Sequence, residues 1–259
     1  MKIAVFVKQV PDSAAKMTVN NGVASWGDAP LVINPWDEYA VEAALQLAEK
    51  HGGQVTALTL GGESAKEALK HALAMGCAQA ILISDPALSA PDAGATSRVL
   101  AAAVKKLGDI ELAVFGKQAI DSDTGLTPAM TARVLGWPAL TLVAAISQLD
   151  PAAKTIRVER GIEEGRQIVD GKLPAVLSIV KDFGEPRYPS FMGIRKASKA
   201  EIPTWSLGDL GISAPQSKVT WPEISGLAQR EVTNEMITGS TPDEIAAKLA
   251  DKLIAEGVL

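Results

Sequence analysis

The five consecutive apolar residues Ile3-Ala4-Val5-Phe6-Val7, followed by Lys8, decide the fold. A run without polar alternation is typical of a strand that is buried on both faces, as the strands of a parallel sheet are. The same pattern recurs four times further along the chain, at Val55–Leu60, Ala80–Ser84, Leu112–Phe115 and Ala139–Val143. We therefore expect these five segments to form buried strands of one sheet.

Helical patterns separate these strands. Small and apolar residues recur at helical spacing in Asp37–His51, Ser64–Met75 and Ala95–Leu107. Thr127 followed by Pro128 predicts a further helix, with Thr127 as its capping residue. The alternation predicts an α/β fold with a doubly wound, mostly parallel sheet. Ligands of such sheets bind at the carboxyl ends of the strands, which directs attention to the loops after Val7, Leu60, Ser84 and Phe115.

The overall charge argues against two classes of partner. The 259 residues contain 25 Lys and Arg against 30 Asp and Glu, a net charge of −5. We therefore expect neither nucleic acid nor an anionic membrane surface as a partner.

The longest apolar stretches, such as 137–146, have about half of the roughly 20 residues that span a bilayer. The first residues lack the pattern of a cleaved signal peptide, which predicts an unprocessed cytoplasmic protein.

Residues suited to catalysis or metal binding are scarce. The single cysteine, Cys77, excludes an internal disulfide and a cysteine-based metal cluster. Both histidines lie in helical patterns without a paired nucleophile. We interpret His51 as a cation at a helix end and His71 as a surface or packing residue. The sequence thus predicts no catalytic residue and no metal site.

The composition changes near Lys181. Several prolines and glycines and a run of cations follow, and periodic apolar residues are too few for a separate core. We expect an α/β domain over 1–185 and an extended arm over 186–259. Thr241-Pro242-Asp243-Glu244 predicts a capped terminal helix ending at Gly257. Such a helix needs a surface to pack on, either in its own domain or in another chain.

The densest polar loop, Gly116–Thr127, lies between a buried strand and a helix. Its small residues let a ligand approach the backbone, and N–H groups at the helix start can hold a phosphate. Thr124 and Thr127 add hydroxyl groups, whereas Asp121 and Asp123 repel phosphate and suit ribose hydroxyls or backbone amides better. The alternative is a well-capped surface loop without a ligand.

A second feature is Asn34-Pro35-Trp36-Asp37, which leads into a helix. Trp36 is placed either to flank a nucleotide base or to act as a hydrophobic staple at the helix start. The sequence contains no GxGxxG, no Walker motif and no HxxE metal pattern. A nucleotide would therefore be held by an unfamiliar set of loops.

Six segments resemble the beta subunit of electron transfer flavoproteins, and they occur in the family's order along nearly the whole chain: Lys8–Asp12, Asn34–Glu42, Ala72–Gly76, Gly116–Asp121, Lys172–Val176 and Glu185–Tyr188. The resemblance implies a Rossmann-like, adenine-nucleotide-binding fold and a heterodimer with an alpha subunit that holds most of an FAD. The resemblance further implies that electrons pass from dehydrogenases, such as the acyl-CoA dehydrogenases of fatty acid β-oxidation, to a quinone oxidoreductase. The flavin supplies the redox chemistry in such a complex, which is consistent with the missing catalytic residues.

The resemblance also implies two sets of site residues. A structural AMP is held in this family by positions that match Phe6, Asn34, Pro35, Trp36, Asp37, Leu60, Gln118, Ala119, Ile120, Asp121, Ser122, Asp123, Thr124, Gly125, Leu126, Thr127, Pro128 and Ala129. The loop that docks onto dehydrogenases matches Phe191, Met192, Gly193, Ile194, Arg195 and Lys196, with Phe191 where an apolar anchor stands. The alternative for this loop is packing on the alpha subunit.

The phosphate loop departs from the family's AMP-binding pattern. Asp121-Ser122-Asp123-Thr124 is more similar to the bifurcating branch, in which a second FAD replaces AMP and receives a hydride from NADH. Leu126, however, stands where that branch has Gln, and Thr127 restores a hydroxyl typical of the AMP group. We favour AMP and keep the second FAD as the alternative. Gly161 replaces an acid that in some relatives pairs with the alpha subunit.

A remote alternative is a stand-alone adenylating or ATP-hydrolysing enzyme on a similar sheet. Such enzymes usually carry a Ser-Gly-Gly-x-Asp-Ser loop or a His-x-Gly-His pair, and this sequence has neither.

Overall fold

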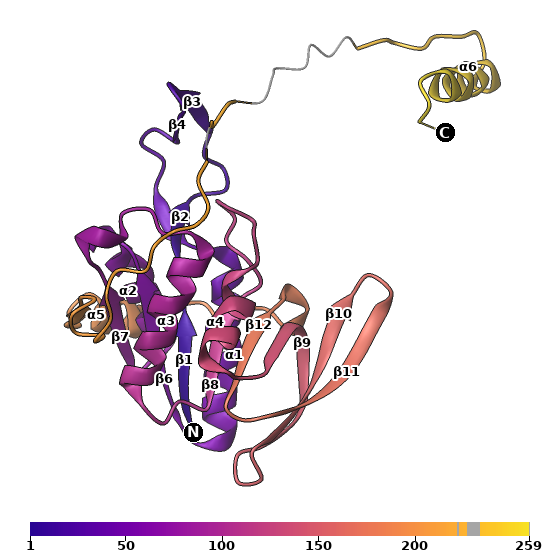
Figure 1. Ribbon diagram of the computed structural model, residues 1–259. Helices are drawn as coiled ribbons and strands as arrows, with labels where there is room; N and C mark the ends of the chain where they lie inside the picture. The colour runs from indigo at the N-terminus through magenta and orange to yellow at the C-terminus, as the bar shows by residue number, and fades with distance from the viewer. Residues whose placement is uncertain (222, 227–233, 259) are drawn as a thin grey trace. The chain divides into compact units, whose positions relative to one another are not determined.

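The computed structural model describes residues 1–221, 223–226 and 234–258. By its internal contacts the chain divides into two compact units, Met1–Glu223 and Ile224–Leu259. The first unit contains the central sheet and five of the six α-helices in the described residues (Figure 1). The second unit contains the remaining helix.

The central sheet of the first unit has nine strands within the described residues, in the order β11-β10-β9-β12-β8-β1-β6-β7-β13. Its bounds are β1 Lys2–Phe6, β6 Gln54–Leu60, β7 Gln79–Ile83, β8 Leu112–Gly116, β9 Ala139–Asp150, β10 Thr155–Ile162, β11 Gly165–Lys172, β12 Ala175–Ile179 and β13 Thr204–Trp205. All neighbouring strands pair in parallel except β9 with β10 and β10 with β11. The prediction of a mostly parallel α/β sheet is confirmed.

The helices follow the predicted alternation. The first unit contains α1 Pro35–His51, α2 Lys66–Met75, α3 Ala93–Leu107, α4 Thr127–Leu135 and α5 Phe191–Ala197, with single 3₁₀ turns at Glu63–Ala65, Pro86–Leu88 and Lys181–Phe183. Two small antiparallel ladders interrupt the crossover between β1 and α1: β2 Gln9–Pro11 with β5 Leu31–Ile33, and β3 Thr18–Asn20 with β4 Val23–Ser25.

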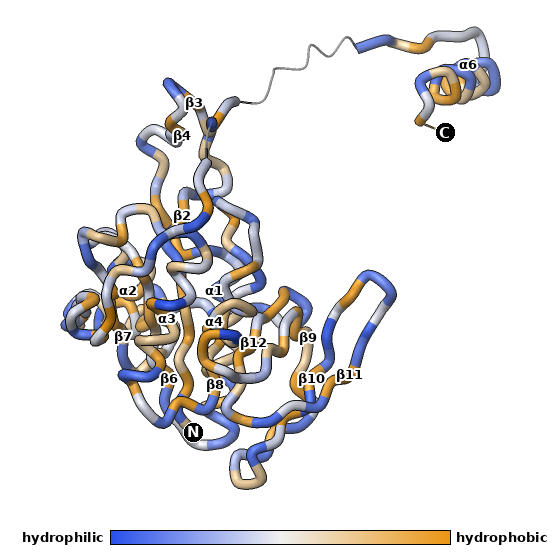
Figure 2. The backbone as a smooth tube through the Cα atoms, viewed as in Figure 1, coloured by the Kyte–Doolittle hydropathy of each residue, from blue (hydrophilic) through white to orange (hydrophobic). Residues whose placement is uncertain are grey.

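Successive residues of β1 contribute to two separate cores, because strand side chains alternate between the faces of a sheet. Ile3 and Val5 pack with apolar residues of α1 and α2. Ala4 and Phe6 pack with apolar residues of α3 and α4 on the opposite face. The hydrophobic colouring in Figure 2 is concentrated along the central strands. The sheet is therefore doubly wound, and its central strands need the uninterrupted apolar runs seen in the sequence.

The sheet is longer than the sequence pattern indicated. The strand expected at Ala139–Val143 continues to Asp150, where β9 pairs antiparallel with β10, and β10 in turn pairs antiparallel with β11. The hairpin of β10 and β11 was not predicted because charged residues recur along it, as in the ion pair of Arg157 Nε with Asp170 Oδ1 at 2.7 Å. Polar side chains suit an exposed antiparallel hairpin, and only its pairing with β9 marks it as part of the sheet.

Residues that follow 185 are attached to the α/β unit at several places. Strand β13 pairs with β7, with Trp205 opposite Ile83. Helix α5 lies against α2, and Asp92 at the start of α3 accepts hydrogen bonds from Lys218 N and Val219 N at 2.6 and 3.1 Å. The chain thus divides after Glu223 rather than after the expected residue 185, because these contacts supply the packing that a helix-periodicity pattern does not reveal.

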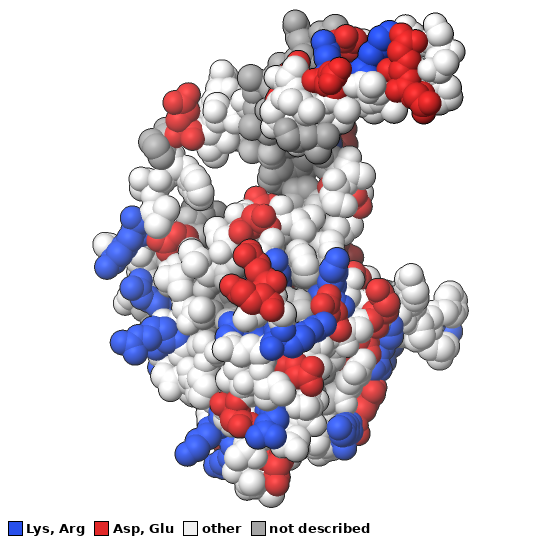
Figure 3. Space-filling model, turned by 90° about the vertical axis from the view of Figure 1, so that its right-hand side faces the viewer, with Lys and Arg blue, Asp and Glu red and all other residues white. Residues whose placement is uncertain are grey.

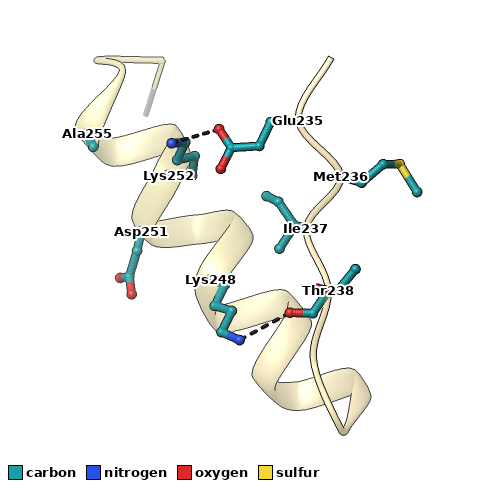
Figure 4. A pocket seen from close by; sticks show the side chains of 8 residues that line it. All are labelled: Glu235, Met236, Ile237, Thr238, Lys248, Asp251, Lys252 and Ala255. Atoms are coloured by element: carbon teal, nitrogen blue, oxygen red, sulfur yellow. Dashed lines mark hydrogen bonds and ion pairs between the residues drawn. The ribbon is translucent and has the colours of Figure 1, made fainter. Parts of the chain in front are cut away.

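The second unit centres on α6, Pro242–Ala255. The predicted cap is present, since Thr241 Oγ1 accepts a hydrogen bond from Glu244 N at 3.3 Å. Figure 4 shows the preceding segment beside the helix, where Lys252 Nζ lies 2.8 Å from Glu235 Oε2 and Lys248 Nζ donates to Thr238 O at 3.1 Å. No residue of α6 is buried within the described part of the chain, so the apolar Ile245, Leu249 and Ile254 stay exposed.

Two further findings concern surfaces. None of the helices in the described ranges is long and apolar enough to cross a membrane. On the face drawn in Figure 3, the cationic and anionic side chains of the described residues are interspersed and form no continuous basic area. This distribution agrees with the net charge of −5.

Candidate functional site

The site of interest lies where β1 and β8 end side by side. Strand β1 pairs with β6 on one side and with β8 on the other. The chain leaves β1 toward α1 and β6, whereas it leaves β8 toward α4, on the opposite face of the sheet. The two loops therefore leave the sheet toward opposite faces at the carboxyl ends, the position where doubly wound sheets bind ligands. We call this end of β1 and β8 the crevice.

Asn34 ties the two loops together. Its side-chain Nδ2 donates to Gln118 O at 2.8 Å, and its Oδ1 accepts from Ile120 N at 3.2 Å. Its own backbone N–H donates to Lys8 O at 2.8 Å. Asn34 is fully buried and precedes Pro35 at the start of α1, yet its side chain does not cap that helix. The buried amide instead fixes the start of the loop after β8, because both of its polar atoms are satisfied there.

Asp37 forms a second tie at the same place. Its Oδ2 accepts a hydrogen bond from Lys8 N at 2.7 Å. Burial raises the pKa of Asp37 to about 7, although hydrogen bonds from Asn34 and from the backbone of Lys8 and Gly116 oppose the shift. Burial disfavours the ionised form of a carboxyl group because the charge loses its contact with water. The site therefore contains a carboxyl group that exchanges its proton near neutral pH.

Gly116 ends β8 directly beside the start of α1. A Cβ atom at this position would lie 2.6 Å from both the backbone C and the backbone O of Trp36. Real Cβ atoms essentially never come so close to a backbone, so only glycine fits without a shift of the chain. The close approach brings the loop after β8 against Trp36 and Asp37.

The two aspartates of the loop are paired with protein donors. Lys8 Nζ lies 2.7 Å from both carboxylate oxygens of Asp121, and Gln118 Nε2 donates to Asp123 Oδ1. The sequence reasoning expected these carboxylates to repel phosphate. The ammonium group of Lys8 offsets the charge of Asp121, which lowers that repulsion at the edge of the sheet.

The start of α4 differs from the prediction. Thr127 is the first helical residue and not the cap, because Leu126 occupies the cap position and offers no side-chain acceptor. The first intrahelical bond of this end runs from Met130 N to Leu126 O at 3.0 Å. The N–H groups of the first turn have no carbonyl partner within a helix. With the positive end of the helix dipole, they form a suitable place for an anionic group.

Aromatic residues flank the crevice in two ways. Lys117 Nζ lies 5.3 Å from the ring centroid of Trp36, which makes a cation–π contact between the two loops. Phe6 is buried and stacks on Phe115 with ring centroids 4.4 Å apart, and Leu60 packs on the same core. The side chain of Phe6 thus belongs to the core, and that of Leu60 is partly buried against it.

The structure therefore brings most of the expected nucleotide positions to one edge of the sheet. Asn34–Asp37, Gln118–Leu126 and Thr127–Ala129 all lie in the loops or helix starts that follow β1 and β8. Two residues outside the expected set complete the arrangement, Lys8 and Gly116. Their signal in the sequence was their position directly at the carboxyl ends of two apolar strands.

The expected docking residues lie elsewhere, on a short helix and not in an irregular loop. Ser190 Oγ caps α5 by accepting a hydrogen bond from Gly193 N at 2.9 Å. The side chains of Tyr188 and Phe191 are 96% and 80% exposed, and Met192, Ile194, Arg195 and Lys196 are exposed or partly exposed. We call residues 188–197 the docking segment. It presents apolar groups with cations next to them to solvent.

The histidines and the cysteine contribute nothing to these two regions. Cys77 is buried, and burial raises the pKa of its thiol to about 12. His71 Nε2 lies 2.8 Å from Glu38 Oε1, between α2 and α1. No group of three or more His, Cys, Asp or Glu in the described residues is arranged to hold a metal ion.

Comparison with known proteins connects the fold and these two regions to a family. Residues 27–210 match the model of the electron transfer flavoprotein domain. The chain is 34% identical to electron transfer flavoprotein subunit beta of Bacillus subtilis, over 99% of this chain and 98% of the relative. It is 36% identical to caffeyl-CoA reductase-Etf complex subunit CarD of Acetobacterium woodii, over 98% of both.

A third relative matches less of the length. Protein FixA of Azorhizobium caulinodans is 39% identical over 82% of this chain and 77% of the relative. The family model covers well over half of the chain, and two relatives above 30% identity cover nearly all of it. The chain therefore belongs to the electron transfer flavoprotein family, with the beta subunits of that family as its relatives.

Proposed function

We propose that this protein is the beta subunit of a heterodimeric electron transfer flavoprotein, an electron carrier and not an enzyme in its own right. Its alpha partner would hold most of an FAD, which supplies the redox chemistry when bound. Electrons would pass from dehydrogenases, such as acyl-CoA dehydrogenases, to a quinone oxidoreductase. The full-length similarity to a beta subunit and the exposed apolar docking segment support this role.

For the crevice at β1 and β8 we propose a structural AMP. The observation that carries this proposal is the set of ties from Asn34 and Asp37, which order the loop after β8 in front of the start of α4. The N–H groups of Thr127 and Ala129 would hold the phosphate. Trp36, beside the loop, would flank the base.

A second candidate for this crevice is a second FAD that oxidises NADH. The Asp121–Thr124 sequence and the similarity to CarD, a subunit of a caffeyl-CoA reductase complex by name, favour this reading. Leu126 argues against it, because an apolar side chain that is 52% exposed stands where a polar contact to that FAD would be made. We therefore place AMP first.

The nucleotide content of the co-purified heterodimer tests this choice. Acid release and chromatography would quantify FAD and AMP for each complex, and we expect one of each. Two FAD and no AMP would identify the second candidate, and a complex with one FAD alone would contradict any nucleotide in the crevice. A colourless protein that hydrolyses ATP without a partner would contradict the electron-carrier role itself.

Two variants test whether the AMP in the heterodimer is bound at the crevice. Asn34→Ala removes both ties to the loop, so we expect AMP to be lost while FAD is retained, because the alpha subunit would hold the FAD. Asn20→Ala, at an exposed position of β3, is the matched control and should retain both nucleotides. Equal AMP content in the two variants would contradict the proposed site.

We also propose that the C-terminal arm, which ends in α6, packs on the alpha subunit. Helix α6 has a complete N-terminal cap but buries none of its residues within the described chain. A capped amphipathic helix gains most of its stability from packing its apolar face, and a partner chain would supply that surface.

A further inference from the structure

An arginine clamp lies directly before the docking segment. Arg187 Nε and one of its terminal nitrogens lie 2.7 and 3.1 Å from the carboxylate oxygens of Glu42. The two terminal nitrogens of the guanidinium donate to the two carboxylate oxygens of Glu49, at 2.6 and 3.1 Å. The backbone N–H of Arg187 donates to Glu42 as well, at 3.1 Å. One side chain thus engages two carboxylates of α1, and both contacts have the fork geometry that only arginine provides.

The surroundings make this clamp stronger than an ordinary surface ion pair. The side chain of Glu42 is only 6% exposed. Burial raises the pKa of Glu42, but hydrogen bonds from Arg187 and Gln46 outweigh that effect and hold its pKa below the ordinary value. The hydrogen bonds to Glu49 and Glu42 raise the pKa of Arg187. The partly buried pair of Arg187 with Glu42 is therefore screened less by salt than an exposed pair.

The clamp joins parts of the chain that are far apart in sequence. Glu42 and Arg187 are separated by 145 residues, and Glu49 lies two helical turns after Glu42 on the same side of α1. Tyr188, the next residue after Arg187, is almost fully exposed, and Phe191 follows three residues later. Arg187 therefore makes the last ion pair with α1 before the exposed side chains of Tyr188 and Phe191.

A second contact fixes the middle of the same segment. A Cβ at Gly193 would lie 3.0 Å from Ser190 Oγ and 3.2 Å from the backbone C of Ala74 in α2. Helix α5 therefore rests closely on α2 at this glycine. With Arg187 held on α1, the segment is attached at two points, and Phe191 lies between them.

We propose that Arg187 is a positioning residue for docking: its clamp on Glu42 and Glu49 fixes the entry of the docking segment, so that Phe191 is presented to a partner dehydrogenase in a preformed position. This proposal rests on the proposed function of the segment. Preorganisation of this kind raises affinity because less conformational freedom is lost on binding.

Hydrogen–deuterium exchange on the purified heterodimer tests the positioning step without any dehydrogenase. In Arg187→Gln the amides of 188–197 should exchange at least tenfold faster than in the parent complex, and in Arg187→Lys by an intermediate factor. Arg157→Gln, which removes the two-point pair with Asp170 on the β10–β11 hairpin, is the matched control and should leave 188–197 unchanged. Unchanged exchange in Arg187→Gln would overturn the proposal.

A second variant guards against a folding defect, because Arg187→Gln leaves the buried Glu42 without its partner. Glu49→Gln removes half of the clamp at a side chain that is 60% exposed. We expect faster exchange of 188–197 in this variant with an unchanged thermal midpoint and unchanged flavin absorbance. Unchanged exchange in a folded Glu49→Gln complex would count against the clamp.

Kinetics with a reduced acyl-CoA dehydrogenase as the probe then test the consequence for docking. Arg187→Gln should raise the KM for the heterodimer about tenfold with little change in kcat, and Arg187→Lys should recover part of the loss. Combined with Phe191→Ala, the effects should not add, because both changes act through one contact. Additive effects would overturn the proposal.

These two experiments separate the possible failures. A parent heterodimer that accepts no electrons from the dehydrogenase would contradict the proposed function, whereas its exchange data would still report on the clamp. Normal electron transfer by the parent together with an unchanged KM in Arg187→Gln would contradict the positioning role alone.

Discussion

The crevice at β1 and β8 and the docking segment show opposite uses of side chains. At the crevice, polar groups such as Asn34 and Asp37 are buried and bond to neighbouring loops. In the docking segment, apolar groups such as Phe191 and Tyr188 point into solvent. Each arrangement costs free energy in an isolated chain. The comparison teaches that both candidate sites lie where the ordinary rule of apolar inside and polar outside is reversed.

Protonation of Asp37 gives the largest effect that we expect at the crevice. The pKa of Asp37 is about 7 in the folded state against an ordinary value of 3.8. Between these pH values Asp37 is protonated in the folded state and ionised in the unfolded state. The contribution of Asp37 to the free energy of unfolding is therefore fully present below about pH 4 and is lost as the pH rises through 7. The loss is at most about 4 kcal/mol. Asp37→Asn should remove this loss.

The thermal midpoint of the heterodimer between pH 4.5 and 8 checks this prediction. The thermal midpoint of the parent minus that of the Asp37→Asn variant should decline with rising pH. The same difference for Asp28→Asn, a control at an exposed position, should not change with pH. Glu42 and Asp92 have lowered pKa values, so their contributions to the stability of the folded protein are lost as the pH falls. The difference between the parent and the variant is therefore needed to isolate the effect of Asp37. If the difference in thermal midpoint did not change between pH 4.5 and 8, Asp37 would be ionised over the whole range and burial would not govern its pKa.

A methyl group at Gly116 should have the next largest effect. Gly116→Ala places a Cβ 2.6 Å from the backbone of Trp36, which has no flexible end to move. We expect a loss of about 2–3 kcal/mol in the free energy of unfolding and a lower AMP content in the purified heterodimer. Gly62→Ala, where an added Cβ meets nothing within 4 Å, is the matched control. Equal stability of the two variants would show that the crevice tolerates more movement than its buried ties indicate.

Truncation of Phe191 should have the smallest effect on folding and a clear effect on docking. Phe191→Ala removes an exposed ring, so the thermal midpoint and the flavin content should stay unchanged. Electron transfer from a dehydrogenase should fall roughly tenfold, as for an anchor residue of modest strength. Met17→Ala, another exposed apolar side chain, should leave the transfer rate unchanged. An unaltered rate in Phe191→Ala would remove the docking role from this segment.

Much of the fold followed from sequence pattern alone. The five predicted strands and the helices between them are present, because uninterrupted apolar runs and helical spacing are local signals. The buried strand β12, Ala175–Ile179, was not predicted, and β9 extends seven residues beyond the expected Val143. The loop positions followed as well, since the carboxyl ends of parallel strands meet at one edge. The hairpin of β10 and β11 was missed, because its charged residues give no buried pattern and its place in the sheet depends on β9.

The roles of individual side chains were less accessible. The sequence suggested that Thr127 caps α4, yet Leu126 takes that position, and Asn34 bonds to Gln118 and Ile120 across the crevice instead of to its own helix. Lys8 and Arg187 find their partners more than a hundred residues away. No local pattern specifies which distant carboxylate a long cation will meet.

The sequence by itself therefore determined the α/β class and the position of five strands along the chain, and it predicted the sheet edge for a ligand, because these depend on periodicity and chain direction. Only the tertiary structure decided that Asn34 and Asp37 tie the crevice loops together, that Gly116 is required by a backbone contact, and that Arg187 holds the docking segment on α1. These features depend on the distances between residues that folding brings together, and hydrogen bonds and close contacts change steeply with distance.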